Sequence, residues 1–147
     1  MLFRSEARRT LPLFMDAASK KRFSPASYSV KVPFIDRSHL GEQAILRTAE
    51  TAAENPTGPI CHLWLTVTSI SDDLIFCSVV EAPDELHLKM GDSFVVASES
   101  IEDWMINVGG TAFGGFSLRV IRSRLGKEGQ MKFDEHTGIR DFKILVP

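Results

Sequence analysis

The chain has 147 residues, about the usual size of one domain, and its 44% hydrophobic and 24% charged residues are typical of a globular protein. A net charge of −2 gives no overall positive field, which argues against nucleic-acid binding. Cys61 and Cys77 lie within or beside apolar runs, so we expect reduced thiols rather than a disulfide framework. No apolar stretch approaches the roughly 18 residues of a membrane span, and the N-terminus lacks a signal-peptide pattern. The sequence therefore predicts a cytoplasmic protein with no membrane contact.

The charges are unevenly distributed along the chain. Residues 1–40 carry eight Lys/Arg against three Asp/Glu, residues 41–103 carry two against twelve, and residues 104–147 carry seven against four. Two interpretations are open: the segments pack together with matched potentials, or the acidic middle faces a basic partner.

The first third of the chain predicts two helices and a strand. Apolar residues recur every three or four positions over residues 3–18, which indicates an amphipathic helix that Pro12 kinks or divides. Alternating apolar and polar residues over 28–32 predict a half-buried strand that ends at Pro33. Residues 42–54 predict a second helix, which the following Asn-Pro-Thr-Gly-Pro run ends.

The middle of the chain predicts strands. Residues 62–70 and 74–80 are apolar runs separated by a short turn, which indicates a β-hairpin, and 93–97 predicts a further strand. Ser100 followed by Asp103 fits a variant of the capping box, so residues 101–108 predict a short helix.

The C-terminal third is less regular. Residues 116–125 fit both helix and strand periodicity, and we favour a helix. Residues 126–138 are polar and predict a loop, and residues 142–146 predict a last strand or an ordered tail. Together the elements predict one α+β domain over residues 1–147: a small, mostly antiparallel sheet with an N-terminal helix and two or three further helices packed on it.

Several segments, in this order, resemble the YegJ-like family of bacterial domains of unknown function. They are residues 7–11 with Phe14, then 30–34, 62–65, 89–92, 101–106 and 114–120. The most specific are Asp103-Trp104-Met105 and the Gly-Gly-Phe-Ser-Leu-Arg run over 114–119. The resemblance implies an α+β domain of bacterial origin and no known reaction.

The chain departs from that family pattern in three places. Cys61 stands where the family usually has an acidic residue, and Glu81-Ala82-Pro83 stands where it tends to have Asn before Pro. The segment at about 38–58 resembles a helical insertion. If either family residue were catalytic, this chain would lack it.

Five residues are candidates for binding. His62 and Trp64 are predicted on one strand face, where His62 fits either a general base or a hydrogen-bonded strand residue. Trp104 fits either a partner anchor, with Asp103 accepting a hydrogen bond, or a core residue beside a helix cap. Arg119 fits either a carboxylate- or phosphate-binding group or a structural ion pair.

No catalytic, cofactor or metal pattern accompanies these candidates. The four histidines are scattered without paired ligand spacing, and the glycine pairs at 109–110 and 114–115 lack the phosphate-loop pattern. The basic residues near Arg119 have no aromatic platform, so nucleic-acid binding is not expected. We therefore expect no cofactor and no metal.

The leading functional prediction is a non-catalytic protein-binding module that engages a partner through the acidic middle segment. One concrete form is an immunity-type or toxin-neutralising protein. The alternative is a small enzyme or small-ligand-binding domain with a pocket around His62, Asp103 and Arg119. The sequence does not indicate an oligomeric state.

Overall fold

A computed structural model describes residues 2–147, and it confirms the α+β class with an N-terminal helix and mostly antiparallel strands. Contacts divide the chain into two compact units. We call Ser29–Glu102 the central unit and the two flanking segments, up to Tyr28 and from Asp103 to Pro147, the terminal unit. The central unit carries four Lys/Arg against twelve Asp/Glu, and the terminal unit carries thirteen against seven. The central unit is therefore net acidic and the terminal unit net basic.

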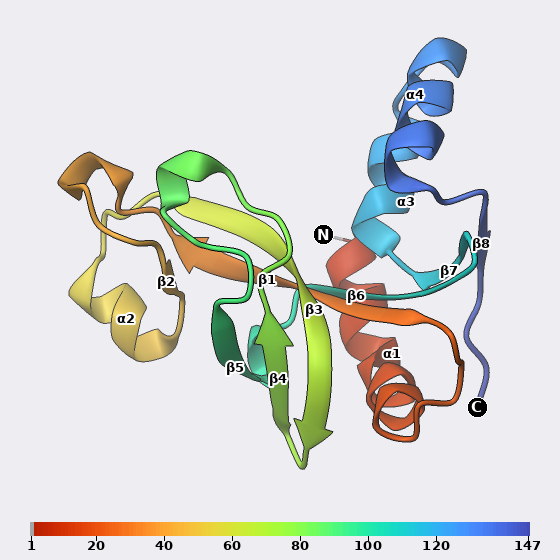
Figure 1. Cartoon of the computed structure of the whole chain (residues 1–147), viewed down its shortest axis with the longest axis horizontal. Helices are drawn as coiled ribbons and strands as arrows, with labels where there is room; N and C mark the ends of the chain where they lie inside the picture. The colour runs from red at the N-terminus through yellow and green to blue at the C-terminus, as the bar shows by residue number, and fades with distance from the viewer. Residues whose placement is uncertain (1) are drawn as a thin grey trace. The chain divides into compact units, whose positions relative to one another are not determined.

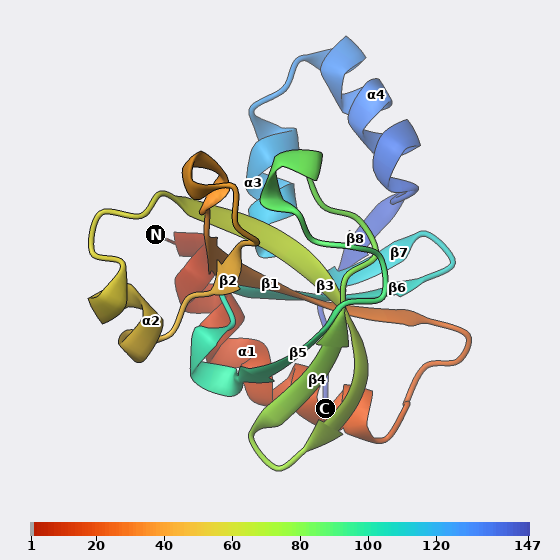
Figure 2. The same ribbon diagram turned by 60° about the vertical axis from the view of Figure 1, so that its left-hand side comes forward.

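The terminal unit is a layer of strands with helices packed on it (Figure 1). Helix α1 packs against β6 and α3, and α3 forms a helical hairpin with α4 (Figure 2). Strands β6 and β7 pair antiparallel, whereas β8 pairs parallel to β7. The elements are α1 (Leu2–Ser19), β6 (Asp103–Val108), β7 (Thr111–Gly114), α3 (Phe116–Ser123), α4 (Lys127–Thr137) and β8 (Asp141–Lys143).

The predicted apolar stripe of α1 is buried in this unit. Ala7, Leu11 and Phe14 are each 5% exposed or less, and the Phe14 ring stacks on Trp104 with centroids 5.3 Å apart. The helix continues through Pro12 without dividing. The burial of this stripe is what positions Trp104 in the core of the unit.

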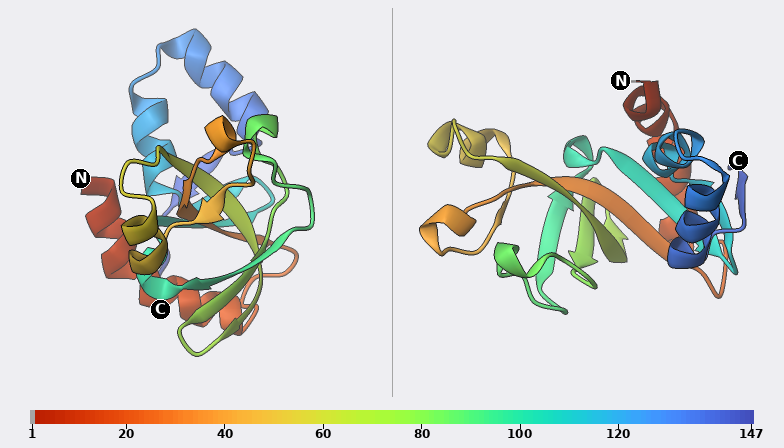
Figure 3. Two further views of the ribbon diagram at one scale, coloured as in Figure 1. Left: turned by 90° about the vertical axis from the view of Figure 1, so that its left-hand side faces the viewer. Right: turned by 90° about the horizontal axis from the view of Figure 1, so that it is seen from above.

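The central unit is an antiparallel sheet in the order β5-β4-β3-β1, with the short β2 also paired to β1 (Figure 3). Its inward-facing apolar side chains include Val32, Leu65 and Val96. The elements are β1 (Ser27–Ile35), which starts two residues before this unit, β2 (Ile45–Leu46), α2 (Ala49–Glu54), β3 (Ile60–Ser71), β4 (Leu74–Ser78), β5 (Ser93–Ala97) and the 3-10 turns η1 (Ser38–Leu40), η2 (Asp84–Leu86) and η3 (Ser98–Ser100).

The structure corrects the predicted helix over 101–108, which is strand β6 instead. Trp104 and Ile106 are buried two positions apart, which is strand periodicity, and the carboxylate of Asp103 caps a helix distant in sequence rather than its own segment. The predicted loop over 126–138 is also wrong, because α4 forms there and packs on α3.

Other boundaries shift. The predicted helix over 42–54 is shorter: Ile45–Leu46 forms β2, and α2 begins only after Thr48, which forms a capping box with Thr51. Strand β1 continues past Pro33 to Ile35, and Pro33 lies opposite His62 in the register with β3. The hairpin, the strand over 93–97 and the helix favoured from residue 116 are confirmed. No helix among residues 2–147 is long and apolar enough to cross a membrane.

Gly114 provides a test of the terminal core. Its φ is +76°, and a Cβ added there would collide with the Trp104 carbonyl oxygen and lie 2.5 Å from the Trp104 ring. Gly109 has a similar φ of +59°, but a Cβ added to it meets nothing within 4 Å. We expect Gly114→Ala to lower the free energy of unfolding by about 3 kcal/mol or more, because overpacking adds to the conformational cost. Gly109→Ala should cost about 1 kcal/mol. Urea denaturation measures both, and equal losses would contradict the packing of Trp104 on Gly114.

Candidate functional site

Asp103 lies at the start of β6, is fully buried, and accepts four hydrogen bonds. Its Oδ1 accepts from the N–H groups of Trp104 at 2.8 Å and Phe116 at 3.2 Å. Its Oδ2 accepts from the N–H of Ser117 at 2.7 Å and from the Ser117 hydroxyl at 2.6 Å. The carboxylate therefore satisfies the free N–H groups at the start of α3 and joins that helix to β6.

The environment of Asp103 acts on its protonation in two directions. Burial raises the pKa of Asp103 above its ordinary value, and the hydrogen bonds from Ser117, Trp104 and Phe116 oppose this shift. The Ser117 hydroxyl can accept as well as donate, so it can also partner a protonated carboxyl.

Arg119 lies one helical turn into α3, and two of its N–H groups donate to backbone carbonyls. Its Nε donates to the carbonyl of Gly114 and its Nη2 to the carbonyl of Lys143, both at 2.9 Å. The guanidinium also lies 5.2 Å from the ring centroid of Phe116 and 5.0 Å from that of Phe142. Burial lowers the pKa of Arg119, and the charge of Asp103 opposes that shift. Arg119 thus joins α3, the end of β7 and the C-terminal segment.

Trp104 is buried between helices of the terminal unit. Its indole N–H lies 3.2 Å from both the carbonyl oxygen of Ala7 and the hydroxyl of Thr10, and its ring meets Phe116 edge-on. A small cavity of about 90 Å³ lies beside it, lined in part by Arg119 and Leu145. That volume is below the roughly 300 Å³ at which small-molecule sites begin.

His62 and Trp64 lie in the central unit, on the face of β3 opposite the buried Leu63 and Leu65. The Nδ1 of His62 lies 2.5 Å from a carboxylate oxygen of Glu102. The His62 side chain is 41% exposed and that of Glu102 only 12%, so the imidazole is accessible while its partner is largely covered. Such a pair can orient an imidazole for proton transfer.

The structure thus brings Asp103, Trp104 and Arg119 together in the terminal unit and assigns His62 and Trp64 to the central unit. A shared pocket of His62, Asp103 and Arg119 stays a prediction. Sequence reasoning missed Glu102 as the partner of His62, because it placed Glu102 in the first turn of a helix.

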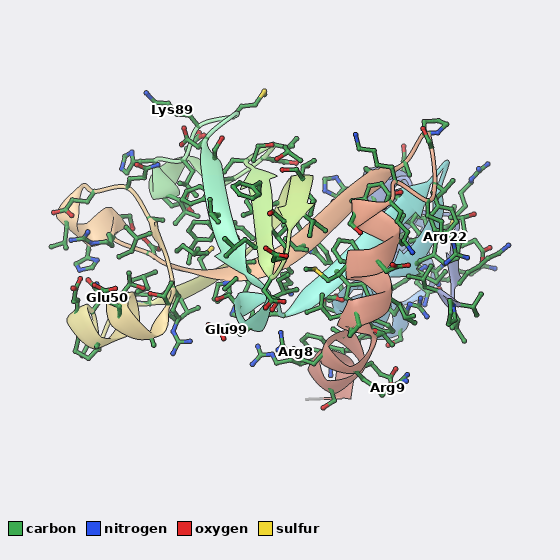
Figure 4. The ribbon with its side chains drawn as sticks, turned by 90° about the horizontal axis from the view of Figure 1, so that it is seen from below. Arg8, Arg9, Arg22, Glu50, Lys89 and Glu99 are labelled. Carbon is green, nitrogen blue, oxygen red and sulfur yellow. The ribbon has the colours of Figure 1, made fainter. Side chains whose placement is uncertain are left out.

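Sequence reasoning also missed a groove of about 480 Å³ in the central unit. Leu46 of β2 and Ala49 and Ala52 of α2 line one side, and Leu74 of β4 and Val95 and Ala97 of β5 line the other. Figure 4 shows Glu50 on α2 and Glu99 on η3, on the two sides of this groove. The sequence predicted the strand over 93–97, which carries no charged residue, but it did not predict the groove beside that strand.

The cysteines are not activated. Burial raises the pKa of Cys77 to about 12, and burial is also the main cause of the raised pKa of Cys61. Neither thiol is ionised appreciably at neutral pH. Within residues 2–147, no three His, Cys, Asp or Glu side chains gather as a metal site would require.

The fold and these contacts define an α+β domain whose most buried polar groups hold its own elements together. The chain belongs to the family of uncharacterised proteins conserved in bacteria known as DUF2314, whose model matches residues 3–142. A protein of Neisseria meningitidis serogroup B, named for ankyrin repeats, is 30% identical over 84 residues, which is 56% of this chain. The match spans 33% of that relative's length. No solved structure matches.

Asp103→Asn tests the role of the buried carboxylate. The amide presents two donors to a site already filled with donors, so we expect the free energy of unfolding to fall by about 2–4 kcal/mol. Ser117→Ala removes only the hydroxyl, and its loss should be about 1 kcal/mol. Urea denaturation at neutral pH compares the two, and a loss for Asp103→Asn no larger than that for Ser117→Ala would disprove the capping role.

The same variant predicts a pH dependence. Because the folded-state pKa of Asp103 is raised, its contribution to stability is complete below its unfolded pKa of about 3.9 and is lost as pH rises through the folded value. Asn does not titrate, so the stability advantage of the wild-type chain over Asp103→Asn should shrink between about pH 4 and pH 7. Urea denaturation across this range measures the difference. A stability advantage of the wild-type chain that grows with pH would contradict this prediction, because it would mean that the hydrogen bonds lower the pKa of Asp103 by more than burial raises it.

Proposed function

We propose that this chain is a non-catalytic protein-binding module whose acidic central unit engages a partner with a basic surface. The observation that carries the proposal is the concentration of charge: the central unit has four Lys/Arg against twelve Asp/Glu. Nine of those twelve carboxylates are exposed. Exposed like charges weaken the unit by mutual repulsion, so a complementary partner gives a reason for their presence.

Two further observations support a binding role. The Asp103 carboxylate is fully buried and accepts four hydrogen bonds from the terminal unit, and the Nε and one Nη of Arg119 donate to backbone carbonyls there, so Asp103 is not available to a substrate. The relative from Neisseria meningitidis is named for ankyrin repeats, and repeat proteins of that kind present extended binding surfaces.

The immunity-type or toxin-neutralising form is the most specific version of this proposal. An acidic domain of this size can cover a basic active site, and the charge alone suggests it. We also propose that, within its family, this chain is one of the YegJ-like domains that its sequence segments resemble.

The experiment begins with affinity purification from the native bacterium and identification of the bound protein, followed by titration of the purified pair. Glu50 and Glu54 are exposed on α2, and replacing both with Gln removes two charges without changing side-chain volume much. We expect the double variant to weaken binding by about 3- to 10-fold, mainly through a slower association rate. Raising the salt concentration should reduce that difference, because exposed charges are screened.

Glu135→Gln is the matched control, because Glu135 is an exposed helical glutamate in the terminal unit. It should leave the association rate unchanged. Recovery of no partner from the host, together with a clean monomer at all concentrations, would contradict the proposal. A partner that binds the Glu50→Gln/Glu54→Gln double variant as tightly as it binds Glu135→Gln would show that the acidic central unit is not the binding surface.

A further inference from the structure

Strand β5 is the open edge of the central sheet, and its backbone has a defined polarity. Ser98 donates its N–H to the carbonyl of Asp73, and the carbonyl of Asp92 accepts from the N–H of Val79. The N–H and C=O groups of the even-numbered residues along β5 therefore face β4. In an antiparallel ladder the alternate residues face the other way. The N–H and C=O groups of Ser93, Val95 and Ala97 therefore point outward, away from β4.

These outward groups have no strand partner among residues 2–147, where β5 pairs with β4 alone. Proteins usually guard such an edge with charged residues, proline, a bulge or a very short strand. Strand β5, Ser-Phe-Val-Val-Ala, has no charge and no proline, and its register with β4 is regular. Val95 is 50% exposed on it. By contrast, β2 has two residues, and β8 has three, with exposed Asp141 and Lys143 at its ends.

The groove lies on the same side as the exposed side chains of this edge. Val95 and Ala97 both line it, and they are also the residues whose backbone groups face outward. A strand added beside β5 would place every second side chain on the groove face, where Ala49 and Ala52 of α2 form the opposite wall. The groove volume of about 480 Å³ lies within the range of ligand sites.

We propose that an extended segment of a basic protein partner pairs with the outer edge of β5 as an additional antiparallel or parallel strand and places alternate apolar side chains in the groove. This deepens the proposed protein-binding function and rests on it. Five residues of β5 span about 17 Å, so the paired part of the partner is about five residues long. Backbone hydrogen bonds provide affinity in such complexes, and alternate side chains provide specificity.

The charge around the groove selects the occupant. Arg47 is the one basic residue lining it, whereas Glu50 and Glu54 on α2, Glu99 on η3 and the Asp72-Asp73 turn beside β4 are acidic and exposed. A basic segment next to the paired residues complements this charge. A second copy of the chain pairing edge to edge would bring two acidic units together, which costs free energy.

Selection from a phage library of random 12-residue peptides against the intact 147-residue chain tests the proposal. We expect the enriched peptides to alternate apolar and other residues over about five positions and to carry Lys or Arg beside that run. A synthetic peptide of the enriched sequence then serves as a fluorescent probe, and anisotropy measures its affinity. Enrichment of nothing, of acidic peptides, or of helical spacing would overturn the proposal.

Variants of Val95 locate the binding edge. Val95→Pro removes an outward N–H and leaves the bonds to β4 in place, so we expect the peptide affinity to fall at least about 10-fold. Val95→Thr keeps the N–H and the branched shape and should bind within about 2-fold of wild type. Met131→Lys, which alters an exposed apolar side chain of the terminal unit, is the second control and should change nothing. If Val95→Pro loses the circular dichroism of the fold, Val95→Lys, which adds a guarding charge to the edge, replaces it with the same expected loss.

The remaining outcomes separate this inference from the proposed function. A native partner that binds Val95→Pro as tightly as wild type would overturn the edge-pairing inference and leave the binding function standing. Sedimentation would assign the edge to a second copy if the wild-type chain self-associates and Val95→Pro does not. That result would overturn the inference that a basic partner pairs with β5.

Discussion

The buried carboxylate of Asp103 is the constraint on which the terminal unit depends. It begins β6 and accepts hydrogen bonds from the N–H groups of Phe116 and Ser117, which begin α3. A charged or polar group without partners in such a position would cost several kcal/mol, so strand and helix are held in one arrangement. Trp104, the next residue, is thereby directed onto Phe14 of α1 and against Gly114, where no side chain fits. One carboxylate thus fixes the positions of a strand and a helix, and the tryptophan beside it brings in a second helix.

This arrangement changes the meaning of the most distinctive sequence motifs. Asp-Trp-Met and Gly-Gly-Phe-Ser-Leu-Arg resemble a signature, and such signatures often suggest catalysis. Here the first motif supplies the cap and the core tryptophan, and the second supplies the capped N–H groups and the arginine that joins α3 to the C-terminal segment. A distinctive motif can therefore record a demanding structural junction, in which each residue type is required by geometry.

The central unit differs in kind. Its core is an ordinary antiparallel sheet, and its unusual features are external: concentrated negative charge, an accessible His62 held by Glu102, and an unguarded edge strand beside an apolar groove. Edge strands without charge or proline expose a protein to unwanted pairing. Retaining one beside a groove and among carboxylates is consistent with a surface that a partner covers. The polar contacts of Asp103 and Arg119 thus lie in the terminal unit, whereas the concentrated negative charge and the groove lie in the central unit.

The sequence by itself determined the elements whose periodicity is local. The stripe of α1, the hairpin of β3 and β4, and strand β5 followed from the spacing of apolar residues, because burial of one face imposes a repeat of 3.6 or 2. The sequence also placed the acidic block that the central unit carries.

Tertiary structure decided the rest. Whether residues 103–108 form a helix or a strand depended on where the Asp103 carboxylate finds donors, and these come from residues 116 and 117 rather than from its own turn. Helix α4 forms in a polar stretch because α3 offers it a packing surface and Arg122 forms a bidentate ion pair with Asp134. The pairing of His62 with Glu102 joins residues 40 positions apart, and the groove joins residues of the 46–52 segment to Leu74 and to residues of the 95–100 segment. Contacts of that range leave no periodic trace in the sequence, since only the folded chain brings their members together.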